Sequence, residues 1–296
     1  IDLTGYTKGE RTGVFSYRAA PIQINYLGYP GTMGAKFIDY IIADQTLIPI
    51  ENQRFYSEQP IYMPHCNICI SSSIPASEIT QPRSELGLPE DGFVFCAINN
   101  TYKITPSEFD IWMRLLKRVD GSVLWLLDTN KWARRNLIKE AEARGISSER
   151  LVFQPKMVVD EASKAKYLAQ FRQADLYLDT FIYSASTTAC DALTAGLPLL
   201  TRTGLGWASL LSASLLKPLG LAELITTTDE DYERLALELS SNPESLALIK
   251  QKLLDNLRSA PVCDDELFAK YLENGYQQAY QRYFDGKKPA AIFVSE

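Results

Sequence analysis

Short apolar runs recur along the chain from about residue 92 onward, without the alternation of polar and apolar positions that marks a half-exposed strand. They predict strands at Phe93–Ile98, Val123–Leu127, Leu151–Phe153, Leu176–Leu178 and Leu197–Leu200. Runs that are apolar throughout are typical of parallel strands covered on both faces. Helical patterns fill the gaps between them, at Pro106–Arg118, Lys131–Ala143, Glu161–Gln173 and Ser186–Ala195. This alternation predicts a doubly wound, Rossmann-type α/β sheet.

Further helical patterns follow the last of these strands. Asp229–Ser241 and Pro243–Ser259 predict two helices, separated by the helix breaker Asn242-Pro243. A final pattern brings a set of apolar residues to one face at helical spacing: Phe268, Tyr271, Leu272, Tyr276, Ala279, Tyr280, Tyr283 and Phe284. We expect a terminal helix that lies across the domain surface. The alternative is a row of aromatic rings that stacks on a cofactor.

The first 70 residues have a different pattern. Pro21–Leu27 and Phe37–Ala43 predict two strands joined by a turn-rich loop. Residues 71–89 are rich in Ser, Pro and Glu, which is typical of a linker. The predicted division is a partial N-terminal α/β domain with its linker at 1–88, a Rossmann-type domain at 89–285 and a tail at 286–296. Because the front part is short for a sheet domain, we expect it to be the second half of one.

Composition excludes several classes of protein. Of the 296 residues, 46% are apolar and 22% charged, which is unlike a disordered chain. The difference between 30 basic and 36 acidic side chains is −6, so no nucleic-acid partner is predicted. The uncharged stretch at residues 203–216 is shorter than the roughly 20 residues of a membrane span, so no membrane partner is predicted either. Five cysteines, an odd number, favour free thiols in a reducing, cytoplasmic compartment.

The strand predicted at Phe93–Ile98 runs directly into a polar loop that contains Asn100 and Lys103. In an open α/β sheet, ligands bind beyond the carboxyl ends of the strands, where this loop must lie. An ammonium group suits a phosphate, and the Asn100 amide can hydrogen-bond a ligand. The alternative is an ordinary loop with a solvated lysine.

A second polar loop follows the strand predicted at Leu176–Leu178 and ends in a run of hydroxyl residues before a helix. Such a run is typical of a helix N-terminus, whose free N–H groups favour phosphate. Thr187 and Thr188 lie at this start, and Asp191 shares a face with Thr187, where its carboxylate can accept from ribose hydroxyls. For this loop alone a simple helix cap is the alternative. Two phosphate-suited loops at one sheet edge together predict a bound nucleotide.

Three other signals are weak. The C-x-x-C of Cys66 and Cys69 has no second pair, and His65 is the only histidine, so a zinc site lacks ligands. Residues 229–231 resemble the D-x-D of metal-dependent sugar transferases, but acidic residues also stabilise a helix start. No G-x-G-x-x-G opens a strand–helix unit, which argues against an NAD enzyme. We predict no metal and no cofactor.

At these loops the sequence resembles the catalytic region of the O-linked N-acetylglucosamine transferase (SPINDLY-type) family. The likeness runs from residue 1 to about residue 225, in the right order. It is carried by the motifs Gly5–Gly9, Pro21–Gln23, Leu27–Thr32, Asp39-Tyr40, Tyr56–Glu58, Asn99–Ile104, Ala174–Leu176, Leu178–Thr180, Thr187-Thr188 and Asp191–Leu193. The resemblance implies a GT-B glycosyltransferase that holds a UDP-sugar against its C-terminal domain. It further implies metal-free transfer of N-acetylglucosamine, or another hexose, to protein Ser or Thr side chains.

The resemblance also implies roles for particular residues. Lys103 would neutralise the diphosphate of the UDP leaving group and is the expected catalytic residue. Gly28 and Pro30 would lie near the transferred sugar and the acceptor. Thr187 and Thr188 would contact the phosphate, and Asp191 would contact the ribose. The expected nucleotide-binding residues are Asn100, Lys103, Tyr167, Thr187, Thr188 and Asp191.

The chain departs from the family at several positions. Tyr167 stands where the family often has histidine, and the basic residue usual near it is either Lys156 or Lys164. Histidine is also usual at Ser186, and arginine at Leu210. The departures at Ser186 and Leu210, with the partial N-terminal domain, favour the alternative function, a degenerate, non-catalytic module that binds UDP-sugar or a protein partner. The family further implies tandem helical repeats of the TPR type before this region.

Overall fold

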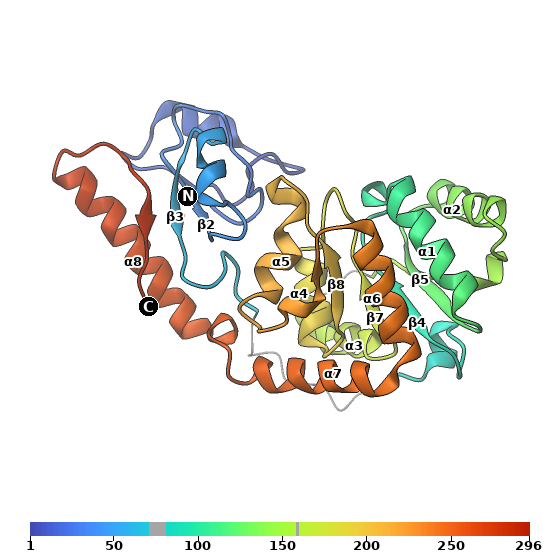
Figure 1. Cartoon of the computed structure of the whole chain (residues 1–296). Coiled ribbons are helices and arrows are strands. Elements are labelled where there is room, and N and C mark those ends of the chain that lie inside the picture. Colours follow the sequence, from blue (N-terminus) through green and yellow to red (C-terminus); the bar gives the residue numbers. More distant parts are fainter. Residues whose placement is uncertain (71–80, 158–159) are drawn as a thin grey trace.

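The computed structural model describes residues 1–70, 81–157 and 160–296. Two parallel sheets organise these residues, in the orders β1-β2-β3-β10 and β6-β5-β4-β7-β8-β9 (Figure 1). The strands are β1 Ile24–Asn25, β2 Tyr40–Ala43, β3 Gln59–Tyr62, β4 Val94–Ala97, β5 Val123–Asp128, β6 Leu151–Pro155, β7 Leu176–Leu178, β8 Leu199–Arg202, β9 Ile225–Thr226 and β10 Ile292–Phe293. The α-helices are α1 Pro106–Arg118, α2 Lys131–Ala143, α3 Glu161–Phe171, α4 Thr187–Thr194, α5 Leu211–Leu216, α6 Asp229–Ser241, α7 Pro243–Leu257 and α8 Asp265–Phe284.

The larger sheet has the doubly wound parallel topology that the apolar runs predict. Phe95 of β4 lies opposite Leu124 of β5 on one side and Leu176 of β7 on the other. The strand order therefore reverses between β4 and β7, which is where a ligand cleft forms in this kind of sheet. Every residue of β4 and β7 is buried, since helices cover both faces. The helix α5 and the strand β9 were not predicted, because they span only six and two residues.

The end of the predicted linker packs on the larger sheet. The Arg83 guanidinium pairs with the Asp175 carboxylate (2.9 Å) and donates to the carbonyl of Gln173 (3.0 Å), and Leu88 is buried in the core. Residues 71–80 of that linker lie outside the described residues. The second domain thus begins to pack by about residue 83.

Helix α8 lies across the smaller sheet, as Figure 1 shows. Of its predicted apolar face, Phe268, Tyr271, Leu272, Tyr276 and Ala279 pack on this sheet, whereas Tyr280, Tyr283 and Phe284 are exposed. This face contacts the buried side chains of Tyr40, Ile42 and Ile61, and β10 then pairs with β3 in parallel. Residues 265–296 therefore belong with the N-terminal sheet, whereas the predicted division gave them to the second domain and to a tail. The physical reason is that this sheet needs an apolar cover on its Tyr40–Ile42 face. The chain consequently crosses between the two sheets twice.

Gly275 lies where α8 approaches the smaller sheet most closely. A Cβ atom there would lie 2.7 Å from Cγ2 of Ile61 and 3.3 Å from Cγ2 of Val294. Gly275→Ala is expected to lower the free energy of unfolding by about 1–3 kcal/mol, because overpacking outweighs the gain in helix propensity. Urea denaturation measures the change. Gly13→Ala, where an added Cβ meets nothing within 4 Å, is the matched control, and a stabilised Gly275→Ala variant would contradict the close packing.

Two chain-wide features complete the fold. All five cysteines lie within the described residues, and each is a free thiol. Among the described helices, none combines the length and the apolar character that crossing a membrane requires.

Candidate functional site

A cleft of about 420 Å³ opens at the carboxyl ends of β4 and β7, where the strand order reverses. The loop after β4, the loop after β7 and the start of α4 form one wall, and the N-terminal domain forms the other. The cleft brings together six of the eight predicted site residues: Gly28, Pro30, Asn100, Lys103, Thr187 and Thr188. The sheet-edge argument predicted this meeting of the two polar loops.

Lys103 is held by the loop that follows β7. Its ammonium Nζ donates to the carbonyl oxygen of Ser184 (3.0 Å) and lies 4.0 Å from the ring centre of Tyr183. Only 9% of Lys103 is exposed, so the alternative of a solvated lysine is wrong. Burial lowers the pKa of the ammonium to about 8, and the nearby charge of Asp179 opposes this shift. The cation is therefore positioned in advance for an anionic ligand.

The N-terminus of α4 forms the facing part of the wall. Ser186 is the N-cap residue, and within the described chain its side chain caps none of the first-turn N–H groups. The N–H groups of a first helical turn have no intrahelical partner, so those of Thr187 and Thr188 are available to an anion. A ligand phosphate between Lys103 and this turn would meet a cation on one side and a helix dipole on the other.

Two asparagines fix the loop that carries Lys103. The Asn99 side chain donates from Nδ2 to Oγ1 of Thr180 (3.2 Å) and accepts at Oδ1 from the backbone N–H of Asn100 (3.1 Å). Asn99 is buried and thus ties the two polar loops together. Asn100 lines the cleft, and among the described residues its side chain makes no hydrogen bond.

Gly28 and Pro30 reach the cleft from the N-terminal domain. A Cβ on Gly28 would lie 2.4 Å from the carbonyl oxygen of Leu3, so only glycine fits this close approach of two backbones. The following turn is held by Asn25, whose Nδ2 donates to the carbonyl of Tyr29 (2.8 Å). The glycine therefore has a packing reason as well as a place in the cleft.

Tyr167 and Asp191 form a separate group beside the cleft. Among the described residues, the Asp191 carboxylate pairs with the Lys164 ammonium and accepts a hydrogen bond from the Tyr167 hydroxyl. Burial raises the pKa of Asp191, and the bond to Lys164 opposes that shift. Of the two lysines left open by the sequence, Lys164 is the one that reaches this group. In this structure the carboxylate predicted for ribose is thus occupied by an ammonium.

Asp179 is the functional candidate that the sequence reasoning missed, although its motif was noted. It follows β7 directly, is fully buried and carries hydrogen bonds from both ends of the adjacent loop. The one available signal was an acidic residue at the end of an apolar strand. The neighbouring helix α5, whose Ser212 hydroxyl donates to the carbonyl of Ala185 (3.0 Å), was not predicted from the sequence.

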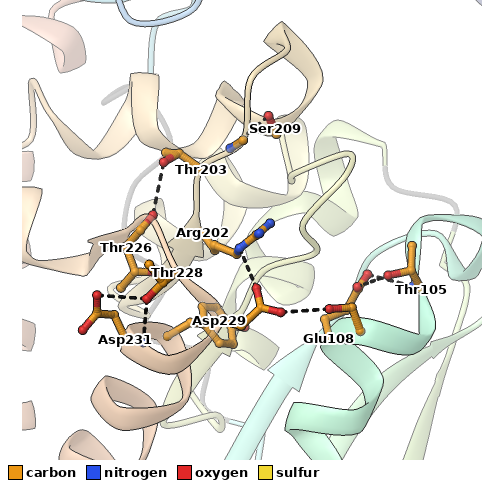
Figure 2. Close-up of polar contacts among 12 residues, drawn as sticks. Thr105, Glu108, Arg202, Thr203, Ser209, Thr226, Thr228, Asp229 and Asp231 are labelled. Carbon is orange, nitrogen blue, oxygen red and sulfur yellow. Dashed lines mark hydrogen bonds and ion pairs between the residues drawn. The ribbon is translucent and has the colours of Figure 1, made fainter.

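Within the described structure, the residues of the two weak metal motifs have structural roles. Figure 2 shows Arg202 paired with Asp229 (2.7 Å), while the Thr228 hydroxyl accepts from the N–H of Asp231 (3.1 Å) and so caps α6. Cys69 Sγ lies 3.3 Å from the carbonyl oxygen of Val262, in the contact between the two domains. The acidic run at residues 229–231 is therefore the start of a helix, which was the alternative to a metal site.

Two of the departures from the family, Ser186 and Leu210, lie at different depths. Ser186 lines the cleft, and Leu210 is buried at the start of α5 with 9% of its surface exposed. A buried leucine at this position supplies packing and no charge.

The chain matches the family model of glycosyl transferase family 41 over residues 1–70 and 66–272. It is 33% identical over 302 residues to the "Probable UDP-N-acetylglucosamine--peptide N-acetylglucosaminyltransferase SEC" of Arabidopsis thaliana, covering 100% of this chain and 30% of that protein. It is 32% identical to the corresponding SPINDLY protein of Eustoma exaltatum subsp. russellianum, over 98% of this chain and 31% of that protein. The chain thus spans less than a third of the length of these curated relatives.

Solved structures agree with the predicted GT-B fold. The O-GlcNAc transferase of Thermobaculum terrenum, as a K341M mutant, superposes with a TM-score of 0.81 and 28% identity, over 95% of this chain and 52% of that one. Sucrose-phosphate synthase of Thermosynechococcus elongatus, at 12% identity and a TM-score of 0.62 over 93% of this chain and 71% of that chain, shares the fold alone. The family resemblance inferred from the loop motifs is confirmed: the chain belongs to glycosyl transferase family 41.

Proposed function

We propose that this chain binds a UDP-sugar in the cleft between its two domains and transfers the sugar to protein side chains. The observation that carries the proposal is the meeting of the Lys103 ammonium and the α4 N-terminus in one cleft. Gly28 and Pro30 enter the same cleft from the other domain, on the side where sugar and acceptor would lie.

The chemistry of the reaction suits this arrangement. In the transfer, the oxygen of the acceptor hydroxyl bonds to the anomeric carbon of the sugar and its proton passes to solvent, while the electron pair of the broken C–O bond leaves with UDP. Negative charge then develops on the β-phosphate, and a preorganised cation with helix-end N–H groups stabilises it in the transition state. Lys103 and the N–H groups of Thr187 and Thr188 supply those donors. The scheme assigns no step to a divalent metal.

The names of the relatives support N-acetylglucosamine as the sugar and a peptide as the acceptor. We further assign Asn100 to the nucleotide, and Tyr167 and Asp191 to its uridine end. Since the Lys164 ammonium is paired with the Asp191 carboxylate, this pair must separate when the ribose binds. A domain boundary near residue 88, a cytoplasmic location and upstream helical repeats belong to the same proposal. Protein Ser and Thr hydroxyls are the proposed acceptor groups.

Titration calorimetry with UDP, followed by an assay of UDP release from UDP-N-acetylglucosamine with a peptide acceptor, tests the proposal. Binding of UDP together with sugar transfer is the expected result. Binding without UDP release, in a chain joined to the flanking regions its relatives have, would favour the degenerate module. Absence of UDP binding would refute the proposal and would leave only a degenerate module that binds a protein partner.

The affinity for UDP is expected to fall as the pH rises above 8. Burial lowers the pKa of Lys103 to about 8, so the free protein carries the cation below that pH and loses it above. A bound diphosphate raises this pKa, so binding takes up a proton, and the affinity falls by up to about tenfold per pH unit in this range. Calorimetry between pH 7 and 9.5 measures the slope. A constant affinity over that range would show that Lys103 does not contact the diphosphate.

A further inference from the structure

We propose that Asp179 is a positioning residue for the nucleotide cleft. Its buried carboxylate fixes the loop at residues 179–186 and favours the protonated form of Lys103. The inference rests on the proposed function, because it assigns Lys103 to a diphosphate. Asp179 itself does not line the cleft among the described residues, and it would act on the ligand only through that loop and Lys103.

One carboxylate closes the whole loop after β7. Oδ1 of Asp179 accepts from the backbone N–H groups of Thr180 (2.9 Å) and Ala185 (2.8 Å), which are the first and nearly the last residues of the loop. Oδ2 accepts from the hydroxyl of Thr201 on β8 (2.7 Å), and the Ser212 hydroxyl on α5 donates to the carbonyl of Ala185 (3.0 Å), at the other end of the loop. The loop is therefore anchored at both ends to a single fully buried side chain.

The anchored loop presents the groups that hold Lys103. The Ser184 carbonyl that accepts from Nζ and the Tyr183 ring beneath it lie just before Ala185, whose N–H is bound by Asp179. The next residue, Ser186, begins α4. Movement of Ala185 away from Asp179 would thus displace the support of the cation and the start of the helix together.

The charge of Asp179 has an effect of its own. Its carboxylate opposes the effect of burial on the pKa of Lys103, and burial raises the pKa of Asp179 itself to about 6, so the group is ionised at neutral pH. The other titratable groups that face the pair are the phenols of Tyr177, Tyr183 and Tyr232, whose pKa values burial raises. They remain neutral in this range.

Two further titratable groups lie next to the loop. Glu108 on α1 accepts hydrogen bonds at its carboxylate from Thr105 and from the backbone of Phe181, on the outer side of the loop. Tyr102 lines the cleft beside Lys103.

The burial of the Asp179 carboxylate itself calls for an explanation, because burying a carboxylate is costly unless it is paired. A neutral acceptor would close the loop at lower cost, so the retained charge indicates a role toward Lys103.

Asp179→Asn tests the proposal, because it keeps the size and an acceptor oxygen but removes the charge. Thr201→Val is the matched control, since it removes one hydrogen bond to Asp179 and leaves the charge. UDP affinity is measured by calorimetry from pH 6.5 to 9.5, with circular dichroism as a check of folding. We expect the pH midpoint of binding to fall by about one unit in Asp179→Asn and to stay in place in Thr201→Val. A uniform loss of affinity with an unchanged midpoint would overturn the proposal and leave Asp179 a purely structural residue.

A measurement on the unsubstituted protein keeps the test independent of folding and of UDP. The NMR signal of the Lys103 Cε atom, followed against pH, is expected to show two steps, one near pH 6 from Asp179 and one near pH 8 from Lys103 itself. A single step would contradict the coupling. If the two steps are seen but UDP does not bind, the proposed function fails and the positioning of Lys103 by Asp179 stands.

Discussion

Lys103→Ala is expected to weaken the binding of UDP by about 30- to 150-fold, or about 2–3 kcal/mol, because a hydrogen bond to a charged group is lost from a buried site. Lys103 already lines the cleft and its ammonium is held by the Ser184 carbonyl, so a diphosphate gains the cation without a rearrangement. Titration calorimetry at pH 7 measures the loss. Transfer is expected to suffer more than binding, since the charge on the leaving group grows in the transition state.

Two further variants make this result specific. Lys103→Met keeps the buried stem of the side chain, so a similar loss in Lys103→Met assigns the effect to the charge. Lys117→Ala removes an exposed lysine from α1 and is expected to leave the affinity unchanged. Equal affinity of Lys103→Ala and the unsubstituted protein would mean that the diphosphate binds elsewhere.

Asp44→Ala is expected to lower the free energy of unfolding by about 3–5 kcal/mol, because several buried donors lose their acceptor at once. Oδ1 of Asp44 accepts from the N–H groups of Thr46 (2.8 Å) and Leu47 (2.9 Å). Oδ2 accepts from the N–H of Asn67 (3.1 Å) and from the hydroxyl of Ser214 on α5. The last of these bonds joins the two domains, so the loss affects the interface as well as the N-terminal sheet.

Urea denaturation, followed by circular dichroism, measures the effect of Asp44→Ala. Asp44→Asn keeps one acceptor oxygen and is expected to cost less. Asp120→Ala removes an exposed carboxylate from a loop and is expected to change stability by no more than about 0.5 kcal/mol. A loss in Asp44→Ala as small as in Asp120→Ala would show that the buried bonds contribute little.

The larger sheet was predictable because each of its strands carries its own signal. Runs such as Val123–Leu127 are apolar throughout, and helices of a dozen residues separate them, so local pattern and global topology agree. The smaller sheet was predicted only in part. Its strand β10 has two residues and pairs with β3, more than 200 positions earlier in the chain, and no local pattern marks such a partner.

The same distinction applies to the site. Lys103, Thr187 and Thr188 follow strand ends, and the parallel topology alone brings strand ends to one edge, so their meeting in the cleft was predictable. The pairing of Lys164 with Asp191 was not, since it depends on how α3 packs on α4. Asp179 lacked a predicted role for a similar reason, because a sequence does not show which carboxylate is buried.

The return of α8 to the smaller sheet limits how the two domains can move relative to one another. Two covalent connections, one leading from β3 to the larger sheet and one from α7 to α8, join the domains. The two connections lie side by side where the N–H of Ile70 donates to the carbonyl of Val262 (2.9 Å). A single connection would permit twisting in any direction, whereas this pair favours one rotation, about the line that joins them. Residues on opposite walls of the cleft, such as Pro30 and Lys103, would then move apart and together along a single arc.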